Sequence, residues 1–437
     1  MKYRFLTGLL FGLALAAPAA QASELPTASN KPVVLEAAHL FDGVSGRLMD
    51  HGMVVVQGTR ILAVGHDLKV PAGARVVDLG DATLMPGFID AHVHLSMEMH
   101  KDWYKDFYQQ SFRFPAEQAM YAEMYARRTL EAGFTTVRNV GAQHYITVGL
   151  RNAVNAGVAE GPRILTALHA IGSTGGHADQ DPYPPSMVKP AGPIQGICNG
   201  PAECRAAVRY QIKYGADVIK FMPSGGVLSA SDPVDVPELS QEEMDAIVSE
   251  AHAWHRKVAA HCHGDLAARM AIKAGVDSIE HGTFLKPDTL RMMKKKGVYL
   301  VPTRMAVEWV NDRADGYPPQ IAAKARAAYK AHGEMFREAM KIGVPIAFGT
   351  DSGVSTHGMN AQEFVDMHKL GMSASDALMT ATHNAADLLG VSDITGSLTA
   401  GKSADVVAVK GNVLDNIAAT EHPVFVMKEG AIYVDRE

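Results

Sequence analysis

Residues 85–94 read Met-Pro-Gly-Phe-Ile-Asp-Ala-His-Val-His, an apolar run of strand length that ends in two histidines. Because residues i and i+2 of a strand point to the same face, His92 and His94 can both reach one metal ion. Such a pair standing alone is more often a chance pair or two surface histidines than a metal site. The meaning of this stretch therefore depends on what the rest of the chain contributes.

Apolar runs of strand length alternate with helical patterns through the middle of the chain. The predicted strands are 88–94, 135–139, 164–169, 218–222, 258–263, 278–281, 299–303 and 346–351. A helix start is marked by the capping box Ser240-Gln241-Glu242-Glu243. Eight strands in this order favour a closed barrel over an open doubly wound sheet. We therefore predict an α/β fold with a (β/α)8 TIM-like barrel.

The two ends of the chain lack the alternating strand and helix pattern of the middle. Short β segments punctuated by glycine fill residues 31–84, and the same pattern returns in residues 404–434. We expect both ends to build one small β-sandwich domain. The predicted divisions are a signal peptide at 1–22, β-sandwich segments at 23–86 and 393–437, and the barrel at 87–392.

The first residues predict export. Two cations in residues 1–4 precede an apolar run and the small-residue stop Ala20-Gln21-Ala22, the pattern of a cleaved signal peptide. The apolar run is too short for a comfortable membrane span, so we expect a periplasmic or secreted protein with no membrane association after signal removal. A net charge of −6 without a basic block argues against nucleic acid as a partner.

Three cysteines are too few for a disulfide scaffold. Cys198 and Cys204 are close enough in sequence to bridge in an oxidising compartment, but the sequence leaves the bridged and reduced forms equally open. If they bridge, Cys262 is the free thiol, and we expect it to be buried.

Polar residues of the kind that bind metals stand at the ends of five predicted strands. They are His92, His94, Lys220, His261, His263, His281 and Asp351. The carboxyl ends of barrel strands meet at one mouth, so these side chains are expected to converge there. Imidazoles with a carboxylate suit Zn²⁺ or a similar ion. Each residue alone has an ordinary explanation, but their conjunction predicts a metal centre.

Lys220 is the unusual member of this set because a buried, unpaired ammonium is costly. A catalytic or Schiff-base lysine is one solution. Reaction with CO2 is another, since the resulting carbamate is an anionic group with two oxygens that can bridge two metal ions. The residues themselves do not decide between these solutions.

Residues 85–94 also resemble the opening motif of the amidohydrolase superfamily. The matching motifs follow in the family's order, at 218–220, 260–264, 279–282, 349–352, 381–386, 396–398, 401–402 and 404–405. The resemblance covers nearly the whole mature chain. It implies two divalent metal ions, taken here as Zn²⁺, with His92, His94 and Asp351 on one ion and His261 and His281 on the other.

The same resemblance implies that CO2-derived carboxylation of Lys220 provides the bridge between the two ions. A hydroxide between two divalent ions is available near neutral pH and can attack a carbonyl. Asp351 is then the expected group to take the proton and pass it to the leaving amine.

Within the superfamily the chain resembles a secreted branch of Xaa-Pro dipeptidase-like carboxypeptidases, ochratoxin-hydrolysing amidases and imidazolonepropionase-related proteins. Residues 173–177, 224–227 and 357–360 carry this likeness, in loops that follow strands. It implies a small-molecule amide substrate, either a dipeptide or an N-acyl amino acid, with ochratoxin A as a compatible toxin amide. It also implies a homo-oligomer, with an octamer as one form.

Two alternatives stay open. Hydrolysis of a cyclic amide or deamination, as in imidazolonepropionase-like enzymes, fits the same fold. A non-catalytic relative kept for binding or assembly belongs to another class and predicts missing ligands.

Substrate contacts are predicted from the loops. His169, His177 and His263 are candidates to bind the scissile carbonyl or a substrate carboxylate, with roles as supporting loop histidines as the alternative. Arg304 follows the seventh strand and is a candidate carboxylate clamp, and His357 is a further candidate.

The loop after the first strand is aromatic, with Trp103, Tyr104, Phe107, Tyr108 and Phe112. It predicts either an apolar pocket over the mouth or a helix face packed in the core, and the helical spacing favours core packing.

Overall fold

The computed structural model describes residues 25–100, 102–179, 186–187, 189–229 and 232–436, and it leaves the side chains of Trp103 and Phe107 undescribed. The signal peptide predicted at 1–22 lies outside the described residues. Within the described ranges, no helix combines the length and apolarity needed to cross a membrane.

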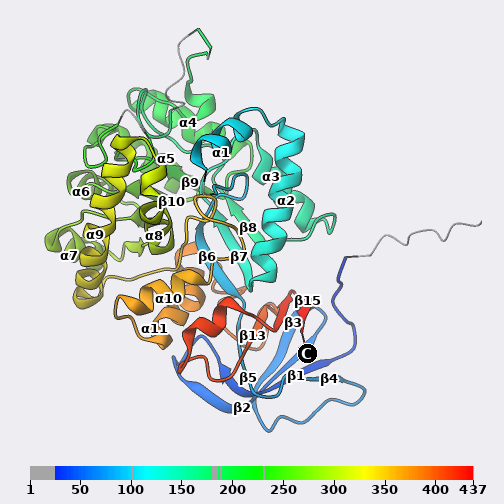
Figure 1. The fold of residues 1–437 in the computed structure, drawn as a ribbon. Coiled ribbons are helices and arrows are strands. Elements are labelled where there is room, and N and C mark those ends of the chain that lie inside the picture. Colours follow the sequence, from blue (N-terminus) through cyan, green and yellow to red (C-terminus); the bar gives the residue numbers. More distant parts are fainter. Residues whose placement is uncertain (1–24, 101, 180–185, 188, 230–231, 437) are drawn as a thin grey trace, which may run out of the picture.

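Two parallel sheets form the centre of the molecule (Figure 1). Their strands are β6 (Phe88–Val93), β7 (Phe134–Asn139), β8 (Arg163–Thr166), β9 (Val218–Phe221), β10 (Lys257–Cys262), β11 (Ser278–His281) and β12 (Tyr299–Val301). Strands β6, β7 and β9 are buried along their whole lengths. Such burial is expected for parallel strands whose two faces are both covered.

Isolated β-bridges connect the two sheets into a ring. Ile171 pairs with Phe221 between the β8 and β9 regions, Leu300 with Ile346, and Val93 with Ser352. The eighth predicted strand, 346–351, pairs with β12 through Ile346, and it contacts β6 because Ala91 donates to Phe348 and Asp351 donates to His92. These contacts close the predicted barrel.

This eighth segment is not a regular strand, in contrast to the prediction. Its backbone bonds change partner within a few residues: Ala347 donates to Leu300, Phe348 to Thr380 and Asp351 to His92. Because Asp351 also has a positive φ of 58°, the extended ladder cannot continue through it.

Helices surround the ring of strands. They are α1 (Trp103–Ser111), α2 (Pro115–Glu131), α3 (Ile146–Asn155), α4 (Pro201–Lys213), α5 (Gln241–Ala253), α6 (Asp265–Ala274), α7 (Pro287–Lys296), α8 (Arg304–Asp312), α9 (Pro319–Ile342), α10 (Gln362–Lys369), α11 (Ala374–Met379) and α12 (Ala385–Leu389), with a π-helical turn at Thr380–Asn384 and 3-10 turns at Pro193–Gln195, Ala314–Gly316 and Ile417–Glu421. The predicted capping box is confirmed: Ser240 accepts the N–H of Glu243, whose side chain accepts the N–H of Ser240, at the start of α5.

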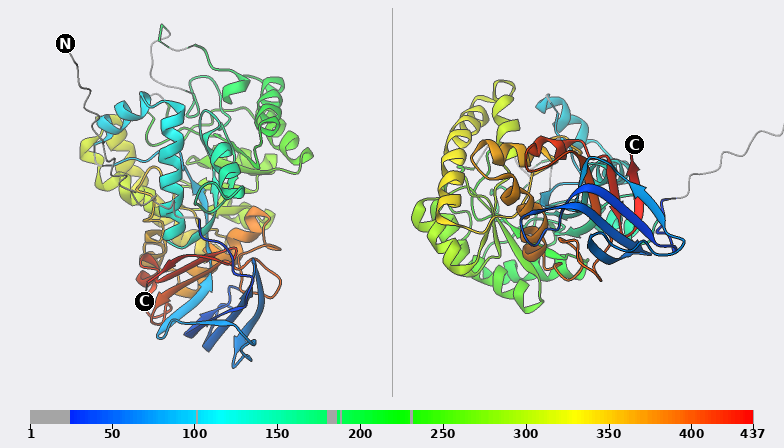
Figure 2. Two further views of the ribbon diagram at one scale, coloured as in Figure 1. Left: turned by 90° about the vertical axis from the view of Figure 1, so that its right-hand side faces the viewer. Right: turned by 90° about the horizontal axis from the view of Figure 1, so that it is seen from below.

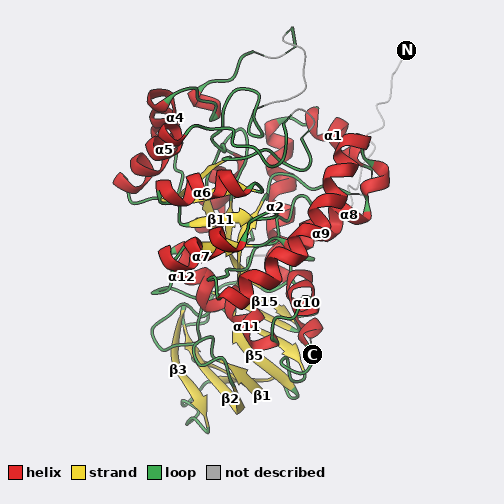
Figure 3. Cartoon of the chain, turned by 90° about the vertical axis from the view of Figure 1, so that its left-hand side faces the viewer, coloured by secondary structure: helices red, strands yellow, loops and turns green. Residues whose placement is uncertain are grey.

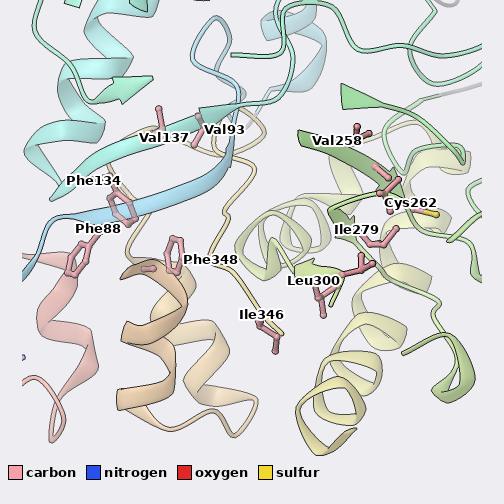
Figure 4. Close-up of a cluster of buried hydrophobic side chains, with 14 of the residues drawn as sticks. Phe88, Val93, Phe134, Val137, Val258, Cys262, Ile279, Leu300, Ile346 and Phe348 are labelled. Atoms are coloured by element: carbon pink, nitrogen blue, oxygen red, sulfur yellow. The ribbon is translucent and has the colours of Figure 1, made fainter. Parts of the chain in front are cut away.

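The apolar core lies between the strands and these helices. The side chains labelled in Figure 4 come from β6, β7, β10, β11, β12 and the eighth segment. Phe88, Phe134 and Phe348 contact one another or Phe364 of α10 through their ring edges and faces. Phe88 and Phe134 are the first residues of β6 and β7, so this aromatic packing anchors the beginnings of these two strands.

Both chain ends build one mixed sheet below the barrel (Figures 2 and 3). Its strands are β1 (Val33–Phe41), β2 (Leu48–Gln57), β3 (Arg60–His66), β4 (Arg75–Asp78), β5 (Ala82–Pro86), β13 (Val406–Lys410), β14 (Phe425–Lys428) and β15 (Ala431–Asp435). The first half of β1 pairs with β4 and its second half with β5, so the sheet divides around a common apolar core. This is the small terminal β unit that the sequence predicted, while the domain limits at 86 and 392 stay predictions.

Cys198 and Cys204 form a disulfide, which settles the pairing that the sequence left open. The bond joins the loop before α4 to the first turn of that helix. Cys262 is a buried free thiol, as expected.

Core packing of the aromatic loop is wrong for the side chains that are described. Residues 103–111 do form a helix, α1, but Tyr104, Tyr108 and the following Phe112 are each at least 60% exposed. Helical spacing indicated the helix correctly. It did not indicate which face is buried, because α1 lies on the outside of the barrel mouth. The core assignment of Trp103 and Phe107 lies outside the described side chains.

Candidate metal centre

Four histidines from three strand ends lie together at the barrel mouth. The ring centroids of His92 and His94 are 5.6 Å apart, those of His92 and His281 are 4.9 Å apart, and those of His261 and His281 are 4.6 Å apart. His92, His261 and His281 are buried. Residues separated by almost 190 positions are therefore in direct contact, as the strand-end argument predicted.

Hydrogen bonds orient three of these rings in the same way. The Nδ1 of His92 donates to Glu280 Oε2 at 2.7 Å, and that of His94 donates to the carbonyl of Gly141 at 3.1 Å. The Nδ1 of His281 lies 2.7 Å from Thr303 Oγ1, whose own hydrogen is donated to Pro302. Each Nε2 is thereby left with a free lone pair, the arrangement seen in histidines that bind metals.

Asp351 faces the same Nε2 atoms. Its Oδ1 lies 3.4 Å from Nε2 of His92 and 3.2 Å from Nε2 of His94. Burial raises the pKa of this carboxyl group, but the two imidazoles outweigh burial and hold the pKa well below its usual range. Asp351 is therefore an ionised carboxylate at physiological pH.

The backbone is strained where the strands end. His281, Thr303 and Asp351 have φ values of 68°, 52° and 58°, which non-glycine residues rarely adopt. Each such residue costs about 1–3 kcal/mol, and strain of this kind gathers at functional sites. At these three residues the backbone leaves the extended conformation of the strands, close to the cluster of histidines.

Lys220 is 1% exposed at the end of β9. In the register between β9 and β10, Lys220 lies beside Ala259, so His261 projects on the same face two residues further along. Burial lowers the pKa of Lys220 to about 8, against the attraction of Glu280 and Asp351. A substantial part of this amine is therefore neutral in mildly alkaline solution.

His177 and His263 also reach the cluster. The ring of His177 stacks on His261 at 4.5 Å, and that of His263 stacks on His281 at 4.9 Å. Burial lowers the pKa of His177 to about 4 and that of His263 to about 3, so both are neutral at pH 7. Nδ1 of His177 lies 3.1 Å from Ser229 Oγ, which ties the loop after β8 to the loop after β9.

Two other predicted substrate residues, His169 and His357, contact residues outside the histidine cluster. The ring of His169 lies edge-on to that of Tyr145, with the ring centroids 6.3 Å apart. The ring of His357 stacks on Tyr125, and its Nε2 lies 3.0 Å from the carbonyl of Met97.

Arg304 is buried, and its guanidinium already has an acidic partner. Nη2 donates to Glu308 Oε1 at 2.6 Å and Nη1 donates to the carbonyl of Tyr329 at 3.0 Å. Because this charge is neutralised within the chain, Arg304 is a poor clamp for a substrate carboxylate.

Two buried networks were not foreseen as part of the site. Asp90 Oδ1 accepts the backbone N–H of His92, and its Oδ2 accepts the hydroxyl of Thr350 and the amide of Asn360. Asp90 therefore joins β6 to the segment that carries Asp351. Burial raises its pKa to about 6 despite these bonds.

The second network consists of Arg138 and Glu280. Its sequence signal is a cation in one predicted strand, Arg138 in 135–139, and an anion in another, Glu280 in 278–281. Each would be unstable in the core without the other.

The donors fit a metal ion. Ligand atoms of His92, His281 and Asp351 lie within 4.8 Å of one another, and so do those of His261, His263 and His281. His261 Nε2 is buried and, among the residues that the structure describes, has no hydrogen-bond partner. A buried nitrogen without a partner is costly unless it binds something. Nitrogen donors with a carboxylate suit a Zn²⁺-like ion.

Known proteins are similar over most of the chain. The model of the Amidohydrolase family matches residues 83–433. An ochratoxinase from Aspergillus niger is 31% identical over 414 residues, which cover 90% of this chain and 84% of that protein. The crystal structure of a Xaa-Pro dipeptidase with methionine bound in its active site has a TM-score of 0.88 at 39% identity, covering 92% and 100% of the two chains. A prolidase complexed with N-methylphosphonate-L-proline has a TM-score of 0.84 at 29% identity, covering 93% and 100%.

Proposed function

Because the chain belongs to the amidohydrolase family and is a metal-dependent hydrolase of carbon–nitrogen bonds, we propose that it hydrolyses a dipeptide or an N-acyl amino acid. The strongest support is the convergence of His92, His94, His261, His281 and Asp351 around the buried Lys220. The similar dipeptidase and ochratoxinase each act on an amide bond of this kind, and both match the chain almost from end to end.

Two divalent metal ions, taken as Zn²⁺, are the cofactors of this proposal. His92, His94 and Asp351 would hold one ion, and His261 and His281 the other. When bound, the ions would acidify a water molecule and polarise the substrate carbonyl. The proximity of His281 to both donor groups is consistent with two ions close together.

Lys220 would bridge the ions as a carbamate. In that reaction the neutral amine adds to the carbon of CO2 and forms an Nζ–C bond. One C=O π bond of CO2 breaks, its electron pair passes to oxygen, and the nitrogen releases one proton, which leaves a carbamate anion. The burial of Lys220 on a strand next to that of His261 supports this role, because an anion there would balance the charge of the ions.

The remaining steps fall to side chains of the mouth. In hydrolysis the amide C–N bond breaks, the water oxygen joins the carbonyl carbon, and one proton must reach the leaving nitrogen. Asp351, ionised between His92 and His94, is placed to take that proton and deliver it. His177 and His263 are neutral and can donate hydrogen bonds to a substrate carbonyl or carboxylate.

Several finer assignments accompany this proposal. His169, Arg304 and His357 stay predicted substrate residues, with Arg304 disfavoured by its bond to Glu308. A homo-oligomer such as an octamer, and export to the periplasm or medium, are also proposed, on the resemblance and on the sequence of residues 1–22.

A panel of linear amides tests the activity. We expect the mature chain, loaded with Zn²⁺ in bicarbonate buffer, to release a free amino acid from at least one class among Xaa-Pro, Xaa-Phe, Xaa-Arg, N-acyl-Phe and ochratoxin A. The release should disappear with a chelator and return with Zn²⁺, measured by chromatography of the products. No release from any linear amide, with bound metal confirmed, would contradict the proposal and favour a cyclic amide or deamination.

A substitution at His177 tests the substrate contact. We expect His177→Ala to lower kcat/KM by about 100-fold, the order found when one stabilising donor is removed, with metal content unchanged. His252→Ala is the control, since His252 is an exposed histidine in the last turn of α5 that pairs with Asp277, the residue before β11. The effect is measured by steady-state kinetics and metal analysis of both variants. Equal kcat/KM values for His177→Ala and His252→Ala would exclude a contact between His177 and the substrate.

A further inference from the structure

Three side chains from three strands form a continuous hydrogen-bonded chain inside the barrel. Arg138 of β7 donates from Nη2 to Glu280 Oε1 at 2.8 Å, and Glu280 Oε2 accepts from Nδ1 of His92 at 2.7 Å. None of the three is more than 1% exposed. This series of hydrogen bonds therefore ends at His92, a predicted metal ligand whose Nε2 faces Asp351.

The partners of Arg138 show that it is built to hold Glu280. Its Nε donates to the carbonyl of Ala91 at 2.6 Å, one residue before His92, and its Nη1 donates to Ser278 Oγ at 3.2 Å. The hydroxyl of Ser278 donates in turn to Glu280 Oε1. A lone buried carboxylate would be strongly destabilising, so Arg138 is what allows an anion to stay at this position.

A carboxylate that accepts the hydrogen of Nδ1 has a defined chemical consequence for His92. It keeps the hydrogen on Nδ1, leaves the lone pair on Nε2 and fixes the plane of the ring. It also makes Nε2 a stronger electron-pair donor toward a metal ion. At the same position, Nδ1 of His94 donates to the neutral carbonyl of Gly141, and Nδ1 of His281 donates to the hydroxyl oxygen of Thr303. Among these three rings, His92 is the one whose Nδ1 meets a carboxylate.

We propose that Glu280, with Arg138 as its counter-ion, is a positioning residue that sets the donor strength of His92 toward the metal ion shared with His94 and Asp351. This inference rests on the proposed metal centre. It implies that the two proposed ions differ in what their affinity depends on. The affinity for the ion held by His92 would depend on the buried Arg138–Glu280 pair, whereas the affinity for the ion held by His261 and His281 would not.

A purely structural salt bridge would behave differently. Its loss would lower the stability of the barrel and leave the relative affinity of the two ions unchanged. The positioning role instead predicts selective weakening of one ion. The two roles are therefore separated by metal affinity measured on folded protein.

The test is Glu280→Gln, which keeps the size of the side chain and removes its charge. We expect one of the two Zn²⁺ ions to bind about 10–100-fold more weakly, as for other supporting partners of metal ligands, and the other to keep its affinity. Chelator competition with Zn²⁺ gives both affinities, and the absorption spectrum of the Co²⁺-loaded protein shows which site is altered.

Asp405→Asn is the matched control. Asp405 is also a buried carboxylate, and it accepts from Arg163 Nη1 at 2.9 Å, but it lies beside the terminal sheet. Its substitution is expected to lower the melting temperature without changing either metal affinity. If Glu280→Gln fails to fold, the double variant Arg138→Met with Glu280→Gln removes both charges together, and the same selective weakening is expected.

Unchanged affinities in the Glu280 variants, or equal weakening of both ions, would overturn the inference while leaving the proposed activity intact. A wild-type chain that binds no divalent ion would overturn the metal centre and this inference together.

Discussion

Replacing Asp351 with Asn is expected to lower kcat on the order of 10³-fold, in the range for loss of a proton-transferring group. The carboxylate lies within 3.4 Å of Nε2 of both His92 and His94. Asn keeps the shape and one oxygen, but it has no negative charge and cannot accept the proton. Steady-state kinetics with the substrate found in the amide panel, together with metal analysis, measure the effect.

Asp366→Asn is the control for this variant. Asp366 is a buried carboxylate of α10 that pairs with Lys369, outside the histidine cluster. The kcat of this variant is expected to stay within about a factor of two of the wild type, because the substitution removes a buried carboxylate that belongs to no candidate metal group. A kcat within tenfold of the wild type for Asp351→Asn itself would remove Asp351 from the mechanism.

Lys220→Ala is expected to lower kcat on the order of 10³-fold and to reduce the bound metal, because the substitution would remove the anion proposed to bridge the two ions. If that anion is a carbamate, a small carboxylate such as acetate or propionate can enter the space left by the side chain and restore part of the activity. Wild-type protein in ¹³C-labelled bicarbonate should show a carbamate resonance that the variant lacks.

Lys428→Ala provides the comparison, since Lys428 is another buried lysine, on β14 beside Glu429. It should keep its activity and should not respond to carboxylates. An active wild-type enzyme without the carbamate resonance would contradict carboxylation, and full activity of Lys220→Ala would contradict any role for Lys220 in the centre.

The barrel strands were predictable because strands buried on both faces are short, nearly continuous apolar runs. The prediction for 278–281 coincides with β11, and that for 218–222 exceeds β9 by one residue. β5, at Ala82–Pro86, was not predicted, since it is short and contains proline. It forms because β1 and β13 lie on either side of it, which is a property of the assembled sheet.

The candidate metal ligands could also be proposed from the sequence, because they stand at strand ends. Their mutual geometry could not. His281 and Asp351 turn toward the mouth through positive φ angles, which local sequence does not specify for non-glycine residues. Among the predicted substrate histidines, His177 reaches His261 while His169 lies against Tyr145. His169 was predicted to end the strand 164–169, but β8 ends at Thr166, so both histidines lie in the segment after this strand.

The sequence by itself determined the barrel class, the terminal β unit and the set of candidate metal ligands, because these depend on the period of apolar residues and on their order along the chain. Only the tertiary structure decided that Glu280 and Arg138 support His92 and that Glu308 neutralises Arg304. His92 and Glu280 are 188 residues apart. Contacts over such separations arise from the closure of the barrel, and no local pattern encodes which charged side chains will meet inside it.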